Sequence, residues 1–303
     1  MTKILVSGST GLIGRGLVSR LESPDHLVIR LIRPESRGRV TGITWDPAGG
    51  LLDPSELEGC GAVVHLAGEN IADRRWSEEQ KRRIRDSRVM GTTLLAKALA
   101  GLDSPPPVFV CASAGGFYGD RGDEILTDSA APGTDFLARV TKEWEDATAP
   151  AAKAGIRVVN MRISVVLTAA GGMLKRVLPI FRLGLGGRLG SGSQYMSWIT
   201  REDLIEAIVW AIERDDLSGG VNISSPNPVT NAEFTRALGR QIGRPAIFSA
   251  PKLALRIAQG DLSDVVLSSI RMSPQRLVES GFEFAHPSID EALRWAVGDV
   301  ESK

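Results

Sequence analysis

The sequence predicts an α/β protein: a doubly wound parallel sheet with a smaller, mainly helical cap on its carboxyl-terminal side. Short apolar runs bounded by turn residues alternate with longer helical patterns through the first half of the chain, which is typical of βαβ units. A glycine-rich segment, GSTGLIGRG, directly follows the first apolar run. The last fifty residues, by contrast, have mainly helical patterns. These observations predict a sheet domain in the first part of the chain and a helical cap after it.

The elements follow in order along the chain. The candidate strands are residues 3–7, 27–32, 42–45, 62–66, 107–112 and 156–162, and a further strand at 220–224 is expected to return to the sheet. Residues 78–99 form the clearest helix, because Ser77 can cap it with Gln80 as the reciprocal partner. From about residue 167 the chain is glycine-rich and aperiodic, which is typical of loops around a site. We therefore expect a sheet domain over residues 1–166 and a substrate-side region over 167–303, with a helical module at about 249–297.

Composition excludes several classes of protein. Thirty-six basic residues balance thirty-six acidic ones, so no overall charge favours a nucleic-acid or anionic-membrane partner. No apolar run reaches membrane length, and ILVSG is too short for a signal-peptide core. The histidines, His26, His65 and His286, are too scattered to predict a metal site. Cys60 and Cys111 have no metal or redox spacing, which fits a reducing cytoplasm.

The glycine-rich segment predicts a dinucleotide site. Gly8, Gly11 and Gly14 form a GxxGxxG arrangement that opens a helix after the first strand. Glycines in this place permit a tight turn, a close approach of backbone to a pyrophosphate, and close packing of helix on sheet. The alternative is that they serve only a turn. Their position at the start of a βαβ series favours the nucleotide and a Rossmann-like fold.

The end of the second strand favours NADP over NAD. The position that would carry an acidic residue for the adenosine ribose hydroxyls holds Arg33. A guanidinium can form a charge-assisted fork with a 2′-phosphate, which a carboxylate would repel. Arg30, Arg37 and Arg39 lie nearby and either help or are simply exposed.

Motifs along nearly the whole chain resemble one family. The segments GSTGLIG, HLAGENIADRRW, SRVMGTTLLAKAL, SAGGFYGDRGDE, FRLGLGGRLGSGSQYMSWITREDL and NPVTNAEF are together similar to the atypical extended short-chain dehydrogenase/reductases of the SDR39U1 type, in the epimerase/dehydratase superfamily. The helical tail is similar to the small carboxyl-terminal module of that group. The resemblance implies cofactor contacts at Gly8, Ser9, Thr10, Gly11, Leu12, Ile13, Gly14, Arg33, Leu66, Ala67, Gly68, Arg88, Lys142 and Val166.

The usual acid/base pair of the wider superfamily is incomplete. The resemblance implies a Tyr-x-x-x-Lys pair on one helix, in which the lysine lowers the tyrosine pKa. Lys142 aligns with that lysine, but the position four residues earlier is Ala138. Lys142 either contacts the nicotinamide ribose or is a surface lysine. We hypothesise that Tyr118 or Tyr195 protonates the substrate while Ser113 donates a second hydrogen bond; the alternative for Tyr118 is a packing role.

The substrate stays open at this point. Glu69, Asn70, Trp76, Gln194 and Trp198 are expected to line its side of the site, although core packing or exposure explains such residues almost as well. The leading hypothesis is an NADP-dependent oxidoreductase or epimerase-like enzyme for a small carbonyl, alcohol or nucleotide-sugar-like substrate. The alternative is a catalytically silent NADP-binding regulator, which the resemblance links to cell division. Many relatives pair through long helices of the sheet domain, so a homodimer is a further expectation.

Overall fold

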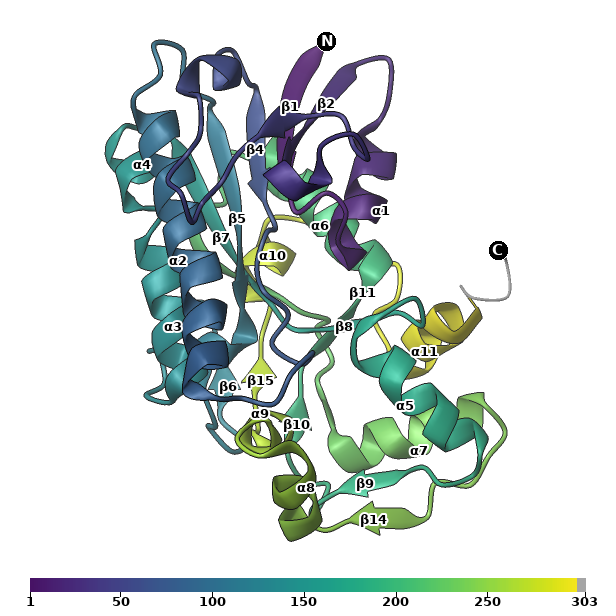
Figure 1. Ribbon diagram of the computed structural model, residues 1–303. Coiled ribbons are helices and arrows are strands. Elements are labelled where there is room, and N and C mark those ends of the chain that lie inside the picture. Colours follow the sequence, from purple (N-terminus) through teal and green to yellow (C-terminus); the bar gives the residue numbers. More distant parts are fainter. Residues whose placement is uncertain (299–303) are drawn as a thin grey trace.

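A seven-stranded parallel sheet forms the centre of the molecule. The computed structural model describes residues 1–298, and its sheet has the strand order β12-β7-β5-β4-β1-β2-β3 (Figure 1). Every neighbouring pair in this sheet is parallel. The strands are β1 (Thr2–Ser7), β2 (His26–Ile32), β3 (Ile43–Thr44), β4 (Ala62–His65), β5 (Val108–Ala114), β7 (Arg157–Ile163) and β12 (Gly219–Ile223). The predicted doubly wound sheet is therefore present, and its seventh strand comes from beyond residue 167.

Helices cover both faces of the sheet. On one face lie α1 (Leu12–Leu21), α6 (Arg201–Glu213) and α10 (Gln275–Glu279), whose apolar side chains join the first hydrophobic core. On the other lie α2 (Glu78–Ala100), α3 (Phe136–Asp146) and α4 (Ala149–Lys153), around the second core. Short 3-10 turns, η1 (Pro34–Ser36), η2 (Pro54–Leu57) and η3 (Gly115–Tyr118), follow β2, β3 and β5. Because both faces are covered, the strands are apolar runs rather than alternating patterns.

The chain order creates a switch point in the sheet. From β1 the chain moves outward through β2 and β3, then returns to the other side of β1 as β4 and continues through β5, β7 and β12. The loops after β1 and β4 therefore leave the sheet in opposite directions and open a crevice at the carboxyl ends of these two strands. Open α/β sheets bind their ligands at such a point.

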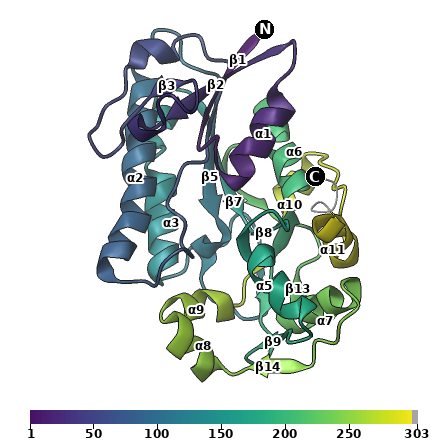
Figure 2. The ribbon, with the colours of Figure 1, turned by 45° about the vertical axis from the view of Figure 1, so that its right-hand side comes forward.

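A second lobe lies beyond the carboxyl edge of the sheet (Figures 1 and 2). It holds short paired strands and a third hydrophobic core. Its strands are β8 (Val165–Leu167) with β11 (Trp198–Thr200), β10 (Tyr195–Met196) with β13 (Val229–Thr230), β9 (Gly187–Leu189) with β14 (Phe248–Ala250), and β6 (Ile125–Leu126) with β15 (Arg271–Met272). Its helices are α5 (Gly172–Arg182), α7 (Asn231–Gln241), α8 (Lys252–Gln259), α9 (Leu262–Leu267) and α11 (Ile289–Gly298). The tail is thus helical with two short strands.

The long helix α2 begins where expected, but its cap is only half of the predicted box. Ser77 Oγ accepts a hydrogen bond from the Gln80 backbone N–H at 3.2 Å. The Gln80 side chain does not return the bond, since its Oε1 accepts no hydrogen bond from the Ser77 backbone N–H, and its Nε2 is buried without a partner among the described residues. A complete box occurs instead at α7, between Thr230 and Glu233. Within residues 1–298, no helix combines the length and apolar character needed to cross a bilayer.

Candidate functional site

The turn between β1 and α1 accepts glycine only. Gly8 has φ +68°, and a Cβ there would lie 2.7 Å from the Leu66 carbonyl carbon. A Cβ on Gly14 would lie 2.2 Å from the Gly8 carbonyl oxygen. These contacts are with backbone, which cannot move aside as a side chain can. The first turn of α1 therefore packs directly on the turn that follows β1. Because no side chain covers the backbone at these glycines, a diphosphate can also approach it closely.

The amino end of α1 is open to an anion. Gly11 is its N-cap residue and offers no side-chain acceptor to the first-turn N–H groups. Such unsatisfied N–H groups, together with the positive end of the helix dipole, bind phosphate. The first turn of α1 carries no acidic side chain that would compete with it. The turn and helix start thus fit the diphosphate of a dinucleotide.

Arg33 lies at the neighbouring strand end. In the parallel pair of β1 and β2, Ser7 is opposite Leu31, so Gly8 and Arg33 leave the sheet side by side. The Arg33 guanidinium is half exposed and 3.8 Å from the Glu35 carboxylate. Next to it is a cavity of about 370 Å³, lined among others by Ile32, Arg37, Gly38, Arg39 and Thr44. This end of the crevice is cationic and open, as a 2′-phosphate site requires.

The loop after β4 forms the other wall. Leu66 and Ala67 lie against the Gly8 turn, and Gly68 faces Arg88 of α2, whose Cζ would be 3.6 Å from a Cβ at that glycine. Arg88 donates to the Ile84 carbonyl at 3.0 Å and lies 5.0 Å from the centre of the Trp144 ring. Burial lowers the pKa of Arg88 to about 10, so the guanidinium remains charged at neutral pH. A buried cation therefore stands behind the crevice.

A buried histidine supports this wall. Ser7 Oγ lies 2.6 Å from His65 Nδ1 and accepts a 3.2 Å hydrogen bond from the Leu66 N–H. Burial lowers the pKa of His65 to about 4, so the ring is neutral at physiological pH. The ring lies edge-on to Trp45, with centroids 5.6 Å apart. The Ser7–His65 pair fixes where Leu66 begins its path along the crevice, although sequence reasoning assigned it no role.

The second lobe closes over the glycine turn. Val166 sits in β8, and its carbonyl lies near Gly172 at the start of α5. A Cβ at Gly171 would lie 2.8 Å from a methyl group of Leu12. The loop after β8 is thus in contact with the first turn of α1. All the cofactor residues expected on β1, β2, β4, α2 and β8 line or adjoin this crevice.

Lys142 lies on the exposed side of α3, as the surface alternative expects. Its ammonium group pairs with Asp146 at 2.6 Å, and the lysine side chain is 53% exposed. The buried side of α3 instead carries Ala138, Val140, Thr141 and Trp144. The lysine side chain therefore points to solvent, whereas that of its neighbour Thr141 lies on the buried side of the helix.

Leu137 and Thr141 of α3 face η3, the turn that follows β5. A Cβ at Gly116 would lie 3.4 Å from Leu137 Cβ and 4.0 Å from Thr141 Oγ1. The two residues are four apart, which is the spacing of the superfamily's acid/base pair, and neither titrates. Thr141 Oγ1 moreover donates to the Leu137 carbonyl at 2.7 Å. The side of α3 that faces η3 therefore carries no Tyr-Lys pair.

Ser113 belongs to a buried polar network that the sequence did not predict. Its Oγ donates to Glu145 at 2.6 Å. The Glu145 carboxylate is bound bidentately by Arg162 at 2.8 and 2.9 Å, and both side chains are almost fully buried. Burial works against the charge, but the hydrogen bonds and charge of Glu145 raise the pKa of Arg162. A charged residue inside the apolar run VVNMRIS was the signal that could have revealed this pair.

Tyr118 lies in the same network. Its ring is fully buried; its hydroxyl accepts from Arg162 at 2.9 Å and donates to Asn222 Oδ1 at 2.6 Å. Burial, the largest effect, raises the pKa of Tyr118. This geometry favours the packing alternative over the catalytic one. Tyr195, by contrast, is half-buried in β10 beneath the Arg271 guanidinium, which lies 4.5 Å from its ring centre.

The expected substrate residues divide into two groups. Trp198 is fully buried in the third core and donates to the Asn227 carbonyl at 3.0 Å, so it is a core residue rather than a wall of the site. Gln194 is half-buried and donates to the Leu189 carbonyl at 3.1 Å. Glu69, Asn70 and Trp76 instead lie together on the connection from β4 to α2.

That connection, residues 69–77, bridges the two lobes, and we call it the strap. Asp73 pairs with Arg176 of α5 at 3.1 Å, and Arg75 donates to the Ile257 carbonyl of α8 at 3.4 Å. Trp76 stacks edge-on against Phe136 at the start of α3, with centroids 5.3 Å apart. The strap therefore crosses the opening between the sheet domain and the cap. Among residues 1–298 no cluster of three or more His, Cys, Asp or Glu side chains is placed to hold a metal.

The switch-point crevice and the glycine turn define a dinucleotide-binding protein of the Rossmann type. Comparison with family models then places it: the chain belongs to the NAD dependent epimerase/dehydratase family, whose model matches residues 4–224. A second model, described as a domain of unknown function (DUF1731), matches residues 250–296. The predicted family and its carboxyl-terminal module are confirmed.

Several relatives match along their whole length. The epimerase family protein MT2273 of Mycobacterium tuberculosis is 45% identical over 97% of both chains. The epimerase family protein SDR39U1 of Homo sapiens is 35% identical, over 96% of this chain and 98% of its own. A crystal structure of human SDR39U1 (isoform 2) with NADPH has a TM-score of 0.89 and 31% identity, over 98% of this chain and 100% of that one. UDP-N-acetylglucosamine 4-epimerase of Bacillus cereus, at 18% identity and a TM-score of 0.77, shares the fold.

Proposed function

We propose that this protein binds NADP(H) in the crevice between β1 and β4. The observation that carries the proposal is the glycine turn, where a Cβ on Gly14 would collide with backbone at 2.2 Å. The open amino end of α1 would hold the diphosphate, and Arg33 would hold the 2′-phosphate. The human relative solved with NADPH supports the same choice of cofactor.

Titration of the purified protein with NADPH and with NADH tests this proposal. Nicotinamide fluorescence reports binding of either cofactor. We expect NADPH to bind at least about tenfold more tightly, since a charge-assisted phosphate fork contributes more than about 1.4 kcal/mol. Equal affinities, or tighter binding of NADH, would remove Arg33 from the phosphate site.

We propose further that the protein is an atypical oxidoreductase or epimerase-like enzyme for a small carbonyl, alcohol or nucleotide-sugar-like substrate. When bound, the nicotinamide supplies the hydride chemistry. The chain would place the substrate between α3 and the strap, which carries Glu69, Asn70 and Trp76 and meets α3 where Trp76 packs against Phe136. With Tyr118 held in the buried network, Tyr195 remains the candidate phenol for proton transfer. This role is tested by turnover of Tyr195→Phe once a substrate is found.

A second candidate function is a catalytically silent NADP(H)-binding regulator. The side of α3 that faces η3 favours it, because Leu137 and Thr141 stand there at the spacing of the titrating pair and Lys142 is turned to solvent. A screen of carbonyl, alcohol and nucleotide-sugar compounds for oxidation of bound NADPH or reduction of NADP⁺ separates the two functions. Turnover of any compound supports the enzyme, whereas cofactor binding with no turnover across the screen supports the regulator.

Location and assembly stay predictions. We propose a cytoplasmic location and a homodimer formed through the long helix α2, whose outer face exposes Arg82, Arg85 and Met90. One plant relative, from Arabidopsis thaliana, is named as chloroplastic. Light scattering of the eluted protein measures the oligomeric state, and Met90→Asp should shift a dimer formed through α2 toward monomer.

A further inference from the structure

Exposed apolar side chains gather at the outer end of the second lobe. Five of the thirteen exposed large hydrophobic side chains in the described part of the chain lie there: Ile180, Leu183, Leu185, Ile247 and Phe248. Ile247 is 80% exposed and Leu183 is 75% exposed. Single exposed apolar residues need no explanation, but a group of them marks a surface that contacts another molecule.

Backbone contacts bring the segments that carry these residues next to each other. The Leu185 N–H donates to the Ile180 carbonyl at 3.1 Å, so the chain turns sharply after α5. The Phe248 N–H donates to the Gly186 carbonyl at 3.4 Å, and Phe248 is opposite Gly187 in the β9–β14 pair. The end of α5 and the start of β14 are therefore in contact, although sixty residues separate them in the chain. We call these five residues the apolar corner.

The strand beside the apolar corner has a free edge. β14 pairs with β9 only, in the part of the chain that the structure describes, and no element lies beyond it in either view (Figures 1 and 2). Phe248 and Ala250 direct backbone groups toward β9. Because these groups alternate along a strand, those of Ile247 and Ser249 point outward. Such an edge can accept an added strand.

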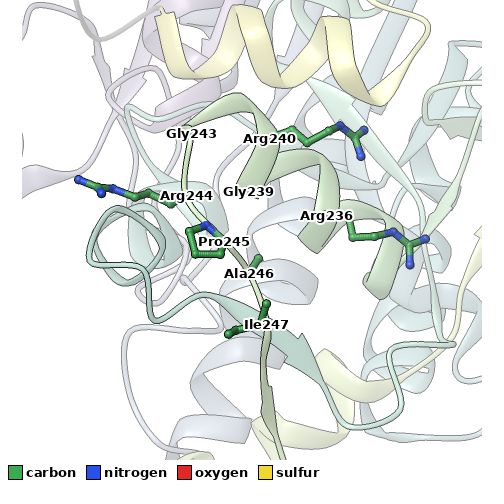
Figure 3. A pocket seen from close by; sticks show the side chains of 8 residues that line it. All are labelled: Arg236, Gly239, Arg240, Gly243, Arg244, Pro245, Ala246 and Ile247. Carbon is green, nitrogen blue, oxygen red and sulfur yellow. The ribbon is translucent and has the colours of Figure 1, made fainter.

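A basic rim adjoins the same strand. A cavity of about 470 Å³ is lined by Ile247 together with Arg236, Arg240 and Arg244 (Figure 3). In this view Arg236 and Arg240 extend to one side and Arg244 to the other, around a floor of small residues. Arg240 pairs with Asp290 at 2.8 Å, whereas Arg236 and Arg244 make no ion pair with any described residue. Two free guanidinium groups thus flank an apolar floor.

We propose that this outer end of the second lobe is a docking site for an acidic, extended segment of a partner protein, which adds as a strand along β14. Its backbone would bond to the outward groups of Ile247 and Ser249. Its apolar side chains would cover the apolar corner, and its carboxylates would pair with Arg236 and Arg244. The site is remote from the cofactor crevice, so the proposal stands apart from the cofactor chemistry.

Other occupants fit the surface less well. A second copy of this chain in a two-fold contact would bring the same arginines near themselves, and like charges oppose such a contact. An anionic lipid surface would satisfy the arginines and the apolar corner. It would not offer the regularly spaced donors and acceptors that an added strand supplies to the outward groups of β14. A peptide satisfies all three features.

Selection of short random peptides displayed on phage, with the full-length protein as bait, tests the proposal. We expect the enriched peptides to combine Asp or Glu with apolar residues at alternate positions. A fluorescein-labelled synthetic copy of the most enriched peptide then measures affinity by anisotropy. Ile247→Asp and the double variant Arg236→Glu/Arg244→Glu should each weaken binding at least about tenfold. Leu51→Asp and Arg214→Glu, which change an exposed leucine and arginine of the sheet domain, should leave it unchanged.

NADPH binding serves as the folding control, because none of these variants touches the crevice. Enriched peptides whose affinity ignores both variants would overturn the proposal, as would the absence of enriched peptides. Sedimentation with vesicles containing phosphatidylserine tests the lipid surface; binding that Ile247→Asp abolishes would favour membrane over peptide. A dimer that Ile247→Asp converts to monomer would favour a second copy. Either of these last results overturns the peptide site.

Discussion

At the scale of single residues, Arg33 is the proposed basis for choosing between two nearly identical cofactors. Among the described residues its half-exposed guanidinium makes an ion pair only with Glu35, at 3.8 Å, so it can bind a phosphate. We predict that Arg33→Ala weakens NADPH binding about 10- to 100-fold while NADH affinity changes little, since only NADPH carries the 2′-phosphate. Fluorescence titration measures both. Arg214→Ala, far from the crevice, is the control; a variant that weakens both cofactors equally would contradict the assignment.

Substitution of Tyr118 distinguishes a structural role of its hydroxyl from a catalytic one. Removing its hydroxyl would leave Asn222 Oδ1 without its partner inside the molecule, and a buried unsatisfied group costs about 1–3 kcal/mol. We predict that Tyr118→Phe lowers the free energy of unfolding in urea by this amount and leaves NADPH affinity unchanged. Tyr195→Phe is the matched control, because that hydroxyl bonds to no described residue. A Tyr118→Phe protein of full stability would contradict the packing role.

His65 makes stability depend on pH in one direction. Burial lowers its pKa from 6.5 to about 4, so as the pH falls the unfolded chain takes up a proton before the folded one does. Its contribution to the free energy of unfolding is therefore complete above pH 6.5 and is lost toward pH 4. The loss amounts to about 3 kcal/mol. Urea denaturation at several pH values across this window should show that the free energy of unfolding falls less steeply with decreasing pH for His65→Asn than for the wild type. An equal dependence on pH in both proteins would mean that the buried ring is protonated without a cost in stability.

At the scale of elements, α1 shows why two neighbouring glycines differ. A Cβ on Gly14 would meet the Gly8 carbonyl at 2.2 Å, whereas one on Gly16 would meet the terminal methyl of Ile205 at 2.5 Å. Only the second neighbour can rotate away. We predict that Gly14→Ala loses about 1–3 kcal/mol of stability and most of its NADPH affinity. Gly16→Ala, which gains helix propensity, should stay near the wild type in both urea denaturation and titration. Similar losses for both variants would contradict the glycine cradle.

In helix α3, a shift of one residue in the register determines which side chain faces the protein interior. The existence of this helix follows from the sequence, but the alignment of Lys142 with the lysine of the superfamily pair does not tell which side of the helix the lysine occupies. The apolar residues Leu137, Val140 and Trp144 recur at helical spacing, which turns Thr141 inward and Lys142 outward. The periodicity thus contained the correct register. Of these two neighbours, Thr141 faces the turn after β5, whereas Lys142 lies on the exposed side of the helix.

At the scale of the whole molecule, local patterns predicted the sheet and its crevice because each strand is a continuous apolar run and each ligand loop follows a strand. The second lobe could not be predicted in the same way. Its strands are two or three residues long, and β9 pairs with β14 across about sixty residues of chain, so no local period marks them. The Glu145–Arg162 pair and the burial of Trp198 also depend on distant contacts. The sequence alone therefore could not predict which aromatic residues line a site and which lie in a hydrophobic core.

The division at residues 166 and 167 has a physical consequence. The first hydrophobic core joins β1 and α1 to residues far beyond that division, including Ile205, Val221 and Leu277. A shared core resists separate unfolding of its parts. The two lobes should therefore behave as one cooperative unit, even though each has apolar clusters of its own.

This unity predicts a single thermal transition that NADPH shifts as a whole. Trp45 and Trp144 report on the sheet, whereas Trp198 reports on the third core. Fluorescence of variants that retain only sheet or only cap tryptophans should give the same midpoint as far-UV circular dichroism. NADPH at about 100 times its dissociation constant adds about 2.7 kcal/mol, which for a chain of 303 residues raises both midpoints by about 4 °C. If the cap melted first at a midpoint insensitive to NADPH, the lobes would be independent, and the contacts of the strap and of the shared core would be too weak to couple the cofactor crevice to the docking surface at the far end.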